Sequence, residues 1–357
     1  MSKVKKLARK VGSAFKKRSL RNGFSLPISF KSDYFVTTDV GIIYIKGDLG
    51  YLLTDQPGYG ISIHEETVFF SYENVSLSQK GWGTSFVVVT DKSSLVNGYM
   101  FGKQKIKKAE RVYKQTFSSS NGRIHQLSYS AKQKKLYICA CEKNSIIEYS
   151  GKEHCTQISP FLDRFGVPIL FDQNHINSVL PVENVIYFIS YKAGGKSMAL
   201  YIVDDECYGW ELGKPGFHDL FPTENGFFTC DTFGDLEQGR VLNQHGNILE
   251  EAFGKNAIAP RGLAGSTSEI LIGHSHKGPR AKRFDGNGGI VVLSDKDHAR
   301  YVELPASQVY QIVRADGTHF VKNESCTNVQ FREHLRSRFG QEQFVGKCVR
   351  ELLPSCL

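Results

Sequence analysis

The sequence lacks the features that would mark a membrane-spanning or secreted protein. No apolar run approaches the roughly 18–20 residues that a transmembrane helix needs. The first residues contain no apolar stretch of the signal-peptide type, which argues against secretion by that route. Eight cysteines are scattered along the chain, and the one close pair, Cys139 and Cys141, lacks the two-residue spacer of common zinc and redox motifs. We therefore expect a cytoplasmic protein whose cysteines are mostly reduced thiols.

Common catalytic motifs are absent too. The chain has no phosphate-binding glycine loop, no Gly-x-Ser-x-Gly nucleophile elbow and no His-Glu-x-x-His helix. A long helical pattern is also missing between residues 33 and 325. This absence excludes an α/β sheet with crossover helices, so the body of the protein has to be built mainly from strands.

Positive charge is concentrated at the beginning of the chain. Residues 1–22 contain nine lysines and arginines and no acidic residue, and the formal net charge of the whole chain is +9. The remaining 335 residues are neutral, with 36 basic and 36 acidic side chains. A neutral body argues against nucleic acid as the main partner, because that binding depends on clustered positive charge.

Residues 1–29 form a basic, amphipathic segment. Its apolar residues follow the spacing of one helical face: Val4, Leu7, Ala8, Val11, Ala14 and Phe15. Such a helix can lie in a membrane interface with its basic face toward anionic lipid. The same pattern fits a transit peptide, a nucleic-acid-binding arm or a solvated tail. The membrane interpretation predicts that residues 1–22 hold the protein peripherally at an anionic membrane, and that the body folds without them.

Residues 30–322 read as a series of short β-rich units. Segments 124–127, 175–178 and 217–220 each place a histidine before such a unit, and these histidines lie 50 and 43 residues apart. Segment 260–264 places an arginine in the same slot, 43 residues later. Four antiparallel strands in about 43–50 residues is the size of one propeller blade. The sequence therefore predicts an all-β fold, a β-propeller.

We predict six blades, with five or seven as alternatives. Segments 33–55 and 307–321 are each too short to form a blade, but together they make one. Pairing the N-terminal strands into the last blade would close the ring and remove its exposed edges. Residues 323–357 alternate large apolar residues with arginines and glutamates, so we expect a helical or irregular appendage on the ring.

The histidine segments predict a site at one mouth of the central channel. The innermost strands of a propeller all run in the same direction, so equivalent strand starts converge there. His125, His175, His218 and Arg261 are expected to form a ring, with Gln126, Asn177 and Asp219 close by. Imidazole is a common ligand of iron, zinc and copper, and manganese is a further candidate. Two histidines on a later strand extend the candidate ligand set: His274, and beside it His276.

These residue types suggest distinct roles. The metal ligands would be His125, His175, His218 and His274, while Asp219 or Asn177 orients a ligand or bound water as a catalytic group. Arg261 would hold an anionic group of the substrate, with Gln126 beside it. The metal would act as a Lewis acid or activate water or dioxygen.

The alternative is a non-catalytic propeller that binds a ligand or a protein, in which the same side chains are hydrogen-bonded channel residues. Either way, we expect a small-molecule or carbohydrate-like ligand at the mouth.

The chain also resembles three known groups of propellers. The repeat, with Pro-Arg-Gly-Leu-Ala at 260–264, resembles six-bladed propellers of the gluconolactonase, strictosidine-synthase and NHL-like group. It is also similar to an uncharacterised bacterial propeller family with His-x-Asn and Arg-Gly-Leu strand starts. The first resemblance implies a divalent metal at the channel mouth, with Asn177 and Asp219 as candidate oxygen ligands.

The third resemblance is local. Residues 217–225 are similar to the His-Asp-Phe-x-x-Thr-Glu-Asn motif of carotenoid-cleaving oxygenases, whose propeller holds iron on four axial histidines. This likeness implies that His218 is an iron ligand, with His125 and His175 as its partners.

Overall fold

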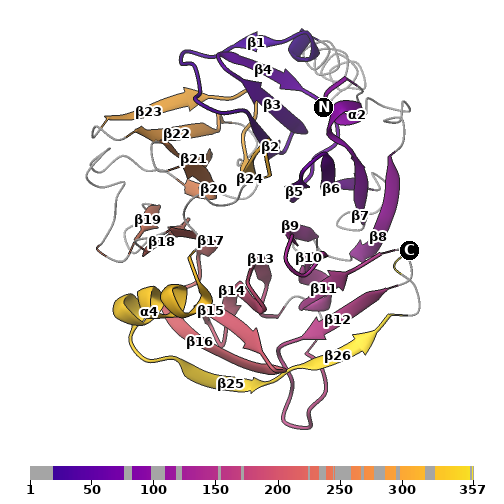
Figure 1. The fold of residues 1–357 in the computed structure, drawn as a ribbon, viewed down its shortest axis with the longest axis vertical. Helices are drawn as coiled ribbons and strands as arrows, with labels where there is room; N and C mark the ends of the chain where they lie inside the picture. Colours follow the sequence, from indigo (N-terminus) through magenta and orange to yellow (C-terminus); the bar gives the residue numbers. More distant parts are fainter. Residues whose placement is uncertain are drawn as a thin grey trace, which may run out of the picture.

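The protein is a six-bladed β-propeller (Figure 1). The computed structural model describes residues 19–75, 83–97, 109–117, 123–151, 154–169, 173–223, 226–232, 239–243, 245, 259–266, 269–276, 286–294, 298–317, 326–353 and 356. Within these ranges, six antiparallel sheets surround a central axis, and in five of them the first strand along the chain is innermost. The predicted all-β fold and the predicted number of blades are confirmed.

Five blades follow one another along the chain. The first contains β5 (Ile61–His64), β6 (Thr67–Val75), β7 (Gly83–Asp91) and β8 (Glu110–Phe117). The second contains β9 (Ile124–Ser130), β10 (Lys135–Ala140), β11 (Ser145–Tyr149) and β12 (Cys155–Ser159). The third contains β13 (Ile176–Val182), β14 (Val185–Ala193), β15 (Lys196–Val203) and β16 (Glu206–Gly213).

The next two blades follow the same plan. The fourth contains β17 (Phe217–Thr223), β18 (Gly226–Asp231) and β19 (Arg240–Leu242), and the outer strand expected at 247–250 lies outside the described residues. The fifth contains β20 (Ala259–Ser266), β21 (Glu269–Ser275), β22 (Gly289–Ser294) and β23 (His298–Glu303).

The sixth blade joins the two ends of the propeller. Its innermost strand is β24 (Val309–Arg314), followed outward by β2 (Tyr34–Thr38), β3 (Ile42–Lys46), β4 (Leu49–Leu52) and β1 (Phe24–Ser25). β24 and β2 are antiparallel, with Tyr34 opposite Arg314 and Thr38 opposite Val309. The predicted closure by N-terminal strands is thereby confirmed, and the ring has no open sheet edge at its seam.

A C-terminal strap, residues 326–353 and 356, runs around the outside of the ring (Figure 1). It consists of α4 (Asn328–Phe339), β25 (Gln343–Lys347) and β26 (Val349–Leu352). α4 starts at a capping box made by Thr327 and Gln330, which satisfies two of its free amide groups. β25 adds a fifth strand to the third blade and β26 adds one to the second. The expected helix is present, whereas these two strands were not predicted.

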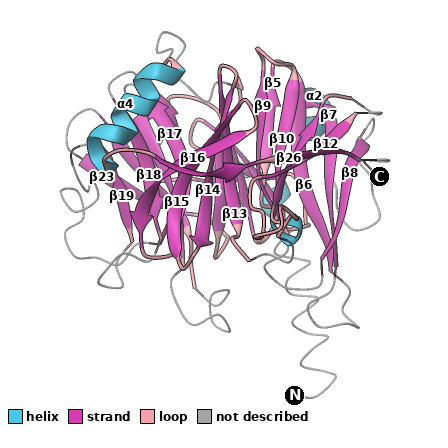
Figure 2. Ribbon diagram, turned by 90° about the horizontal axis from the view of Figure 1, so that it is seen from below, coloured by secondary structure: helices cyan, strands magenta, loops and turns pink. Residues whose placement is uncertain are grey.

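The hydrophobic core lies between neighbouring blades rather than along the axis. The two faces of β14 belong to different clusters, one shared with the second blade and one with the fourth, so this strand is apolar and buried over most of its length. One cluster joins the second and third blades through Ile158 and Phe188, among others. Another joins the third and fourth blades and includes Phe331 and Leu335 of α4, which lies on the outside of the ring in Figure 2.

The cysteines differ in one pair from the expected reduced thiols. Cys155 and Cys356 form a disulfide, while the other six cysteines are buried thiols. The six free thiols agree with the expectation that most of the cysteines are reduced. Among the described residues, no helix combines the length and the hydropathy that crossing a membrane would require. Residues 1–18, most of the basic segment, lie outside the described residues.

Candidate functional site

All six blades contribute a side chain to the channel mouth. A cavity of about 20 Å³ is lined by Tyr59, His125, Gln126, Asn177, His218, Asp219, Arg261 and Tyr310. Six of these eight were predicted from the sequence. The volume is close to that of one water molecule. The described mouth thus has room for an ion or a single ligand group, and not for a whole substrate.

Bulges in the innermost strands orient several of these side chains toward the mouth cavity. The pairing of β9 with β10 shifts at His125 and Gln126, and the pairing of β20 with β21 shifts at Arg261 and Gly262. A bulge turns a side chain out of the regular alternation, which is why bulges recur beside functional sites. His125 and Arg261 therefore occupy the same register position, as the repeat predicted.

The other two histidines occupy different register positions. His218 is a paired residue of β17, opposite Cys230, and the bulge follows it at Asp219. His175 precedes β13, and its carbonyl oxygen accepts a hydrogen bond from the Tyr191 amide. Regular spacing in the sequence does not make the three histidines equivalent, and their rings consequently face different neighbours.

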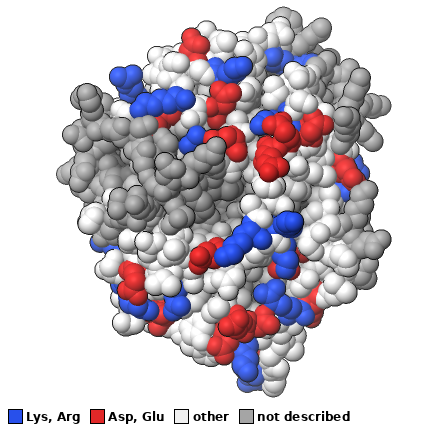
Figure 3. All heavy atoms as spheres, in the orientation of Figure 1, with Lys and Arg blue, Asp and Glu red and all other residues white. Residues whose placement is uncertain are grey.

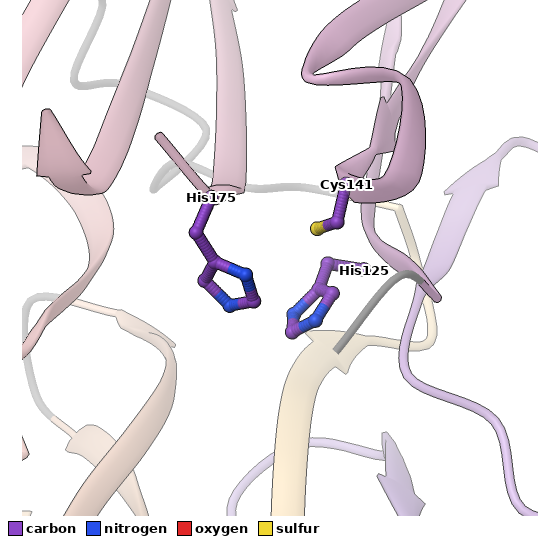
Figure 4. A group of neighbouring side chains, drawn as sticks. All are labelled: His125, Cys141 and His175. Carbon is purple, nitrogen blue, oxygen red and sulfur yellow. The ribbon is translucent and has the colours of Figure 1, made fainter. Parts of the chain in front are cut away.

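The structure brings His125 and His175 together with Cys141, a residue that the repeat did not single out. One ligand atom from each lies within 4.8 Å of the other two. Figure 4 shows the sulfur and both rings facing a shared space, although they come from three elements: His125 from β9, Cys141 from the start of the short helix η1 (Cys141–Lys143), and His175 from the residue before β13. The available sequence signal for Cys141 was its spacing from Cys139, since residues two apart in a strand lie on the same face.

Contacts of these residues keep the group compact, and burial keeps His125 neutral. The Cys141 Sγ donates to the Ile176 carbonyl oxygen at 2.8 Å, and the His125 and His175 rings meet edge to face with centroids 4.9 Å apart. Burial lowers the pKa of His125 well below its usual value, with smaller contributions from the nearby His175, Arg261 and Arg123. His125 is therefore uncharged near pH 7, and the neutral imidazole is the form that binds metals.

His218 lies at the same mouth but in another arrangement. The Asn177 side-chain nitrogen lies 2.7 Å from His218 Nδ1 and 2.9 Å from the Phe217 carbonyl oxygen. An amide nitrogen can only donate, so Nδ1 accepts and the ring proton of neutral His218 is on Nε2. The Tyr191 ring lies between His175 and His218, with centroids 5.4 Å and 5.7 Å away. His218 is thus placed as a hydrogen-bond donor beside the metal-ligand group.

His274 lies in a different part of the protein. It is a residue of β21, its Nδ1 accepts from the Ala259 amide at 3.2 Å, and its ring contacts Tyr301. It does not line the mouth cavity. The structure therefore groups His274 with the fifth blade and not with the other histidines.

Three side chains in the channel form a polar plug: Gln126, Asp219 and Gln311. Gln126 donates to Asp219 Oδ1 at 2.7 Å and accepts from the Val179 amide at 2.9 Å. Asp219 Oδ2 accepts from the Gly262 amide at 2.8 Å. Each side chain of the plug therefore connects innermost strands of different blades.

Gln311 completes the plug from the closing blade. Its Oε1 accepts from the Ile61 amide at 2.9 Å, and its Nε2 donates to the Leu127 carbonyl oxygen at 3.0 Å. These bonds connect the closing blade to the first and second blades. The plug thus gives Gln126 and Asp219 a structural role alongside their predicted functional ones.

Asp219 is the acid at the centre of this plug. It is 5% exposed, and its backbone has a positive φ of 56°. Burial raises the pKa of Asp219 to about 6, although the Gly262 amide, Arg261 and Gln126 favour the charged form. An acid with this pKa can exchange a proton near neutral pH, which general acid–base chemistry requires.

A second network at the mouth was not predicted. Arg123 Nη1 donates to the Tyr59 hydroxyl at 2.6 Å and lies 3.0 Å from a Glu73 carboxylate oxygen. Burial raises the pKa of Glu73 to about 7, against the opposing effect of Arg123. Tyr59 stacks on Tyr310, with ring centroids 4.0 Å apart. These tyrosines occupy the first and sixth blades, where the repeat has no histidine.

The face of the molecule shown in Figure 3 has mixed charge. In the face shown in Figure 3, basic and acidic side chains of the described residues are interspersed, and neither sign forms a continuous field. This distribution agrees with the equal number of acids and bases after residue 22.

Comparisons with known proteins give likeness in fold only. No protein-family model matches the chain, and no curated protein is significantly similar to it. Among solved structures, a chain of a nidogen/laminin complex has a TM-score of 0.49 at 8% identity, covering 79% of this chain and 97% of that one. A putative 6-phosphogluconolactonase from Bacteroides fragilis has a TM-score of 0.41 at 9% identity, covering 79% and 98%. A glucose dehydrogenase has a TM-score of 0.41 at 11% identity, covering 80% and 99%. Functional inference therefore rests on the residues of this chain.

Proposed function

We propose that the protein binds a transition-metal ion at the channel mouth through His125, Cys141 and His175. The observation that supports this proposal is the convergence of three ligand atoms within 4.8 Å from separate elements. Two imidazoles and a thiolate suit zinc, copper or iron better than manganese, which prefers oxygen ligands. Of the predicted ligands, His125 and His175 are kept, and Cys141 takes the place given to His218 and His274.

Beside the metal, Arg261, Asn177 and His218 would bind an anionic, oxygenated small molecule. Arg261 Nε and Asn177 Oδ1 are buried and have no hydrogen-bond partner among the described residues. A ligand with an anionic oxygen and a hydroxyl group would satisfy this donor and this acceptor, and His218 Nε2 would supply a second donor. A hydroxy acid or a sugar acid has this chemistry.

The chemistry of the site would then be divided between the ion and the protein. The metal would act as a Lewis acid or lower the pKa of a bound water. Arg261 would orient the anionic group, and Asp219 would hold or release a proton near neutral pH. The small cavity would admit only the reacting end of the substrate, which limits the access of bulk water.

A metal analysis tests this proposal. Protein purified without an affinity tag should contain one equivalent of zinc, copper or iron, or should take up zinc with one proton released from Cys141. Cys141→Ser and His175→Ala should each lower zinc affinity by at least roughly 10–100-fold, the range found for outer-shell partners. His274→Ala is the matched control and should bind zinc like the wild type.

The alternative function, a non-catalytic binding propeller, is favoured by the polar plug. Gln126, Asp219 and Gln311 are engaged in bonds between blades, as expected of purely structural channel residues. Folded wild-type protein that contains no metal and takes up no zinc would support this alternative and overturn the metal site.

A further inference from the structure

The C-terminal strap is attached to the ring with little apolar burial of its own strands. β25 and β26 are each the outermost strand of a sheet, paired with β16 and β12 respectively. Most of their side chains are exposed, including Phe344 and Leu352. Exposed outer strands contribute little hydrophobic stabilisation, so their attachment depends on other interactions.

Cysteines meet at two points along the strap. Cys356, beyond β26, is bonded to Cys155, the first residue of β12. Cys348, between β25 and β26, lies in the same buried cluster as Cys207 of β16, and the two thiols are close enough to interact. In both pairs one cysteine belongs to the strap and the other to the blade that the strap covers.

The backbone holds Cys207 and Cys348 in place on both sides. Cys207 is opposite Gly346 in the pairing of β16 with β25. The Cys348 amide donates to the Asp205 carbonyl oxygen at 2.7 Å, and the Arg350 side chain forms an ion pair with the Asp205 carboxylate. The two cysteines are 0% and 9% exposed and belong to one core cluster. Their thiols are thus positioned next to each other with little freedom to separate.

We propose that Cys207 and Cys348 form a second disulfide, and that the two disulfides together fasten the strap to the second and third blades. A small-molecule disulfide would be the oxidant. One cysteine thiolate attacks it to give a mixed disulfide, and the other thiolate then displaces the small thiol. Overall, the two cysteine thiols lose two protons and two electrons, and the oxidant is reduced to two thiols.

This bond should form before the strap docks fully. The hydrogen bond with Cys348 and burial both raise the pKa of Cys207 well above its usual value, and the thiolate is the reactive form. Oxidation of the docked pair is therefore slow at neutral pH. A strap fastened by two disulfides belongs to a protein that matures in an oxidising compartment.

Peptide mapping tests this proposal. The reduced, unfolded full chain is refolded in an oxidising glutathione buffer, so that the thiols can react before the strap docks. It is then quenched with acid, alkylated with N-ethylmaleimide in denaturant and digested without reduction. We expect a peptide pair joined through Cys207 and Cys348, lighter by two hydrogens than the two thiol peptides. Cys230, which is fully buried, is an internal control and should be alkylated. Alkylated Cys207 and Cys348 in protein with an intact Cys155–Cys356 bond would overturn the proposal.

Two variants separate the bonds. A Cys155→Ser, Cys356→Ser double variant should still form the second disulfide, which shows that it does not depend on the first. Cys207→Ser should leave Cys348 alkylated. In the Cys155→Ser, Cys356→Ser double variant, trypsin should cleave after the exposed Lys347 more slowly in the oxidised than in the reduced protein, whereas equal rates would show that the second disulfide does not fasten the strap. The wild-type peptide map decides the proposal even if a variant fails to fold.

Discussion

At the scale of single residues, Asp219 shows how structural and functional demands meet. Its side chain connects the fourth blade to the second and fifth blades, and its backbone adopts a positive φ that aspartate tolerates better than most residues. Its carboxylate also interacts electrostatically with Arg261 at the mouth. The contacts between blades and the acidity of the site therefore depend on the same group.

Asp219 should make the stability of the protein fall as pH rises. Its pKa is about 6 in the folded protein and 3.8 in the unfolded reference, so the folded state binds more protons between these values. Stability is therefore lost as pH rises from about 4 to above 6, by about 3 kcal/mol for this group. Asparagine does not titrate, so Asp219→Asn should not lose stability in this way. The difference in stability between the variant and the wild type should therefore shift in favour of the variant as pH increases.

Denaturant unfolding of both proteins from pH 4 to pH 8 measures this difference. Asp204→Asn, on an exposed turn, is the control for removing one carboxylate. Asparagine also loses one of the two accepted hydrogen bonds, at a cost of about 1–3 kcal/mol that does not vary with pH. A constant offset between Asp219→Asn and wild type across this range would show that Asp219 remains charged when buried.

At the scale of elements, α4 is part of the core rather than a surface addition. Its residues Phe331 and Leu335 are fully buried between the third and fourth blades, and Phe331 meets Tyr187 edge to face with centroids 4.7 Å apart. The alternation of apolar and charged residues predicted a helix here. Its docking site depends on the shape of two blades that are distant in sequence.

Phe331→Ala should destabilise the protein by about 3–5 kcal/mol, because it removes a buried aromatic side chain and leaves a cavity. Val329→Ala in the same helix is the matched control, since Val329 is 69% exposed, and should change stability by less than about 0.5 kcal/mol. Thermal and denaturant unfolding measure both values. If Phe331→Ala unfolds like the wild type, then the strap contributes nothing to the stability of the ring.

At the scale of the whole molecule, the basic N-terminal segment and the neutral ring should act separately. Residues 1–18 carry eight of the nine positive charges of the segment. Leu20 and Phe24, which follow, pack against the core of the closing blade. A truncation that tests the segment should therefore stop before Leu20.

Deletion of residues 1–18 should leave the propeller folded and reduce binding to vesicles that contain phosphatidylserine. Each basic residue near such a surface contributes about 1 kcal/mol, and salt screens this attraction. Co-sedimentation at low salt measures the difference, and vesicles of phosphatidylcholine alone are the control. Equal binding of both proteins to anionic vesicles would remove the membrane interpretation.

The sequence alone determined the architecture. Strand-forming segments bounded by turn residues, a repeat of about 43–50 residues and two incomplete end segments predicted six blades and their closure. Each of these features is a property of a short segment or of the spacing between segments, so it can be recognised without coordinates. The convergence of His125, His218 and Arg261 followed from the same repeat, because innermost strands share one direction.

Only the tertiary structure decided which side chains meet. Shifts of one residue in strand register place His175 beside His125 and Cys141, and place His218 beside Asn177 instead. The strap strands and the Cys207–Cys348 contact depend on docking between segments more than 100 residues apart. Register and docking are fixed by packing across blades, and a shift of one residue turns a side chain to the opposite face. The spacing of residues along the chain does not reveal the strand register or the docking of distant segments.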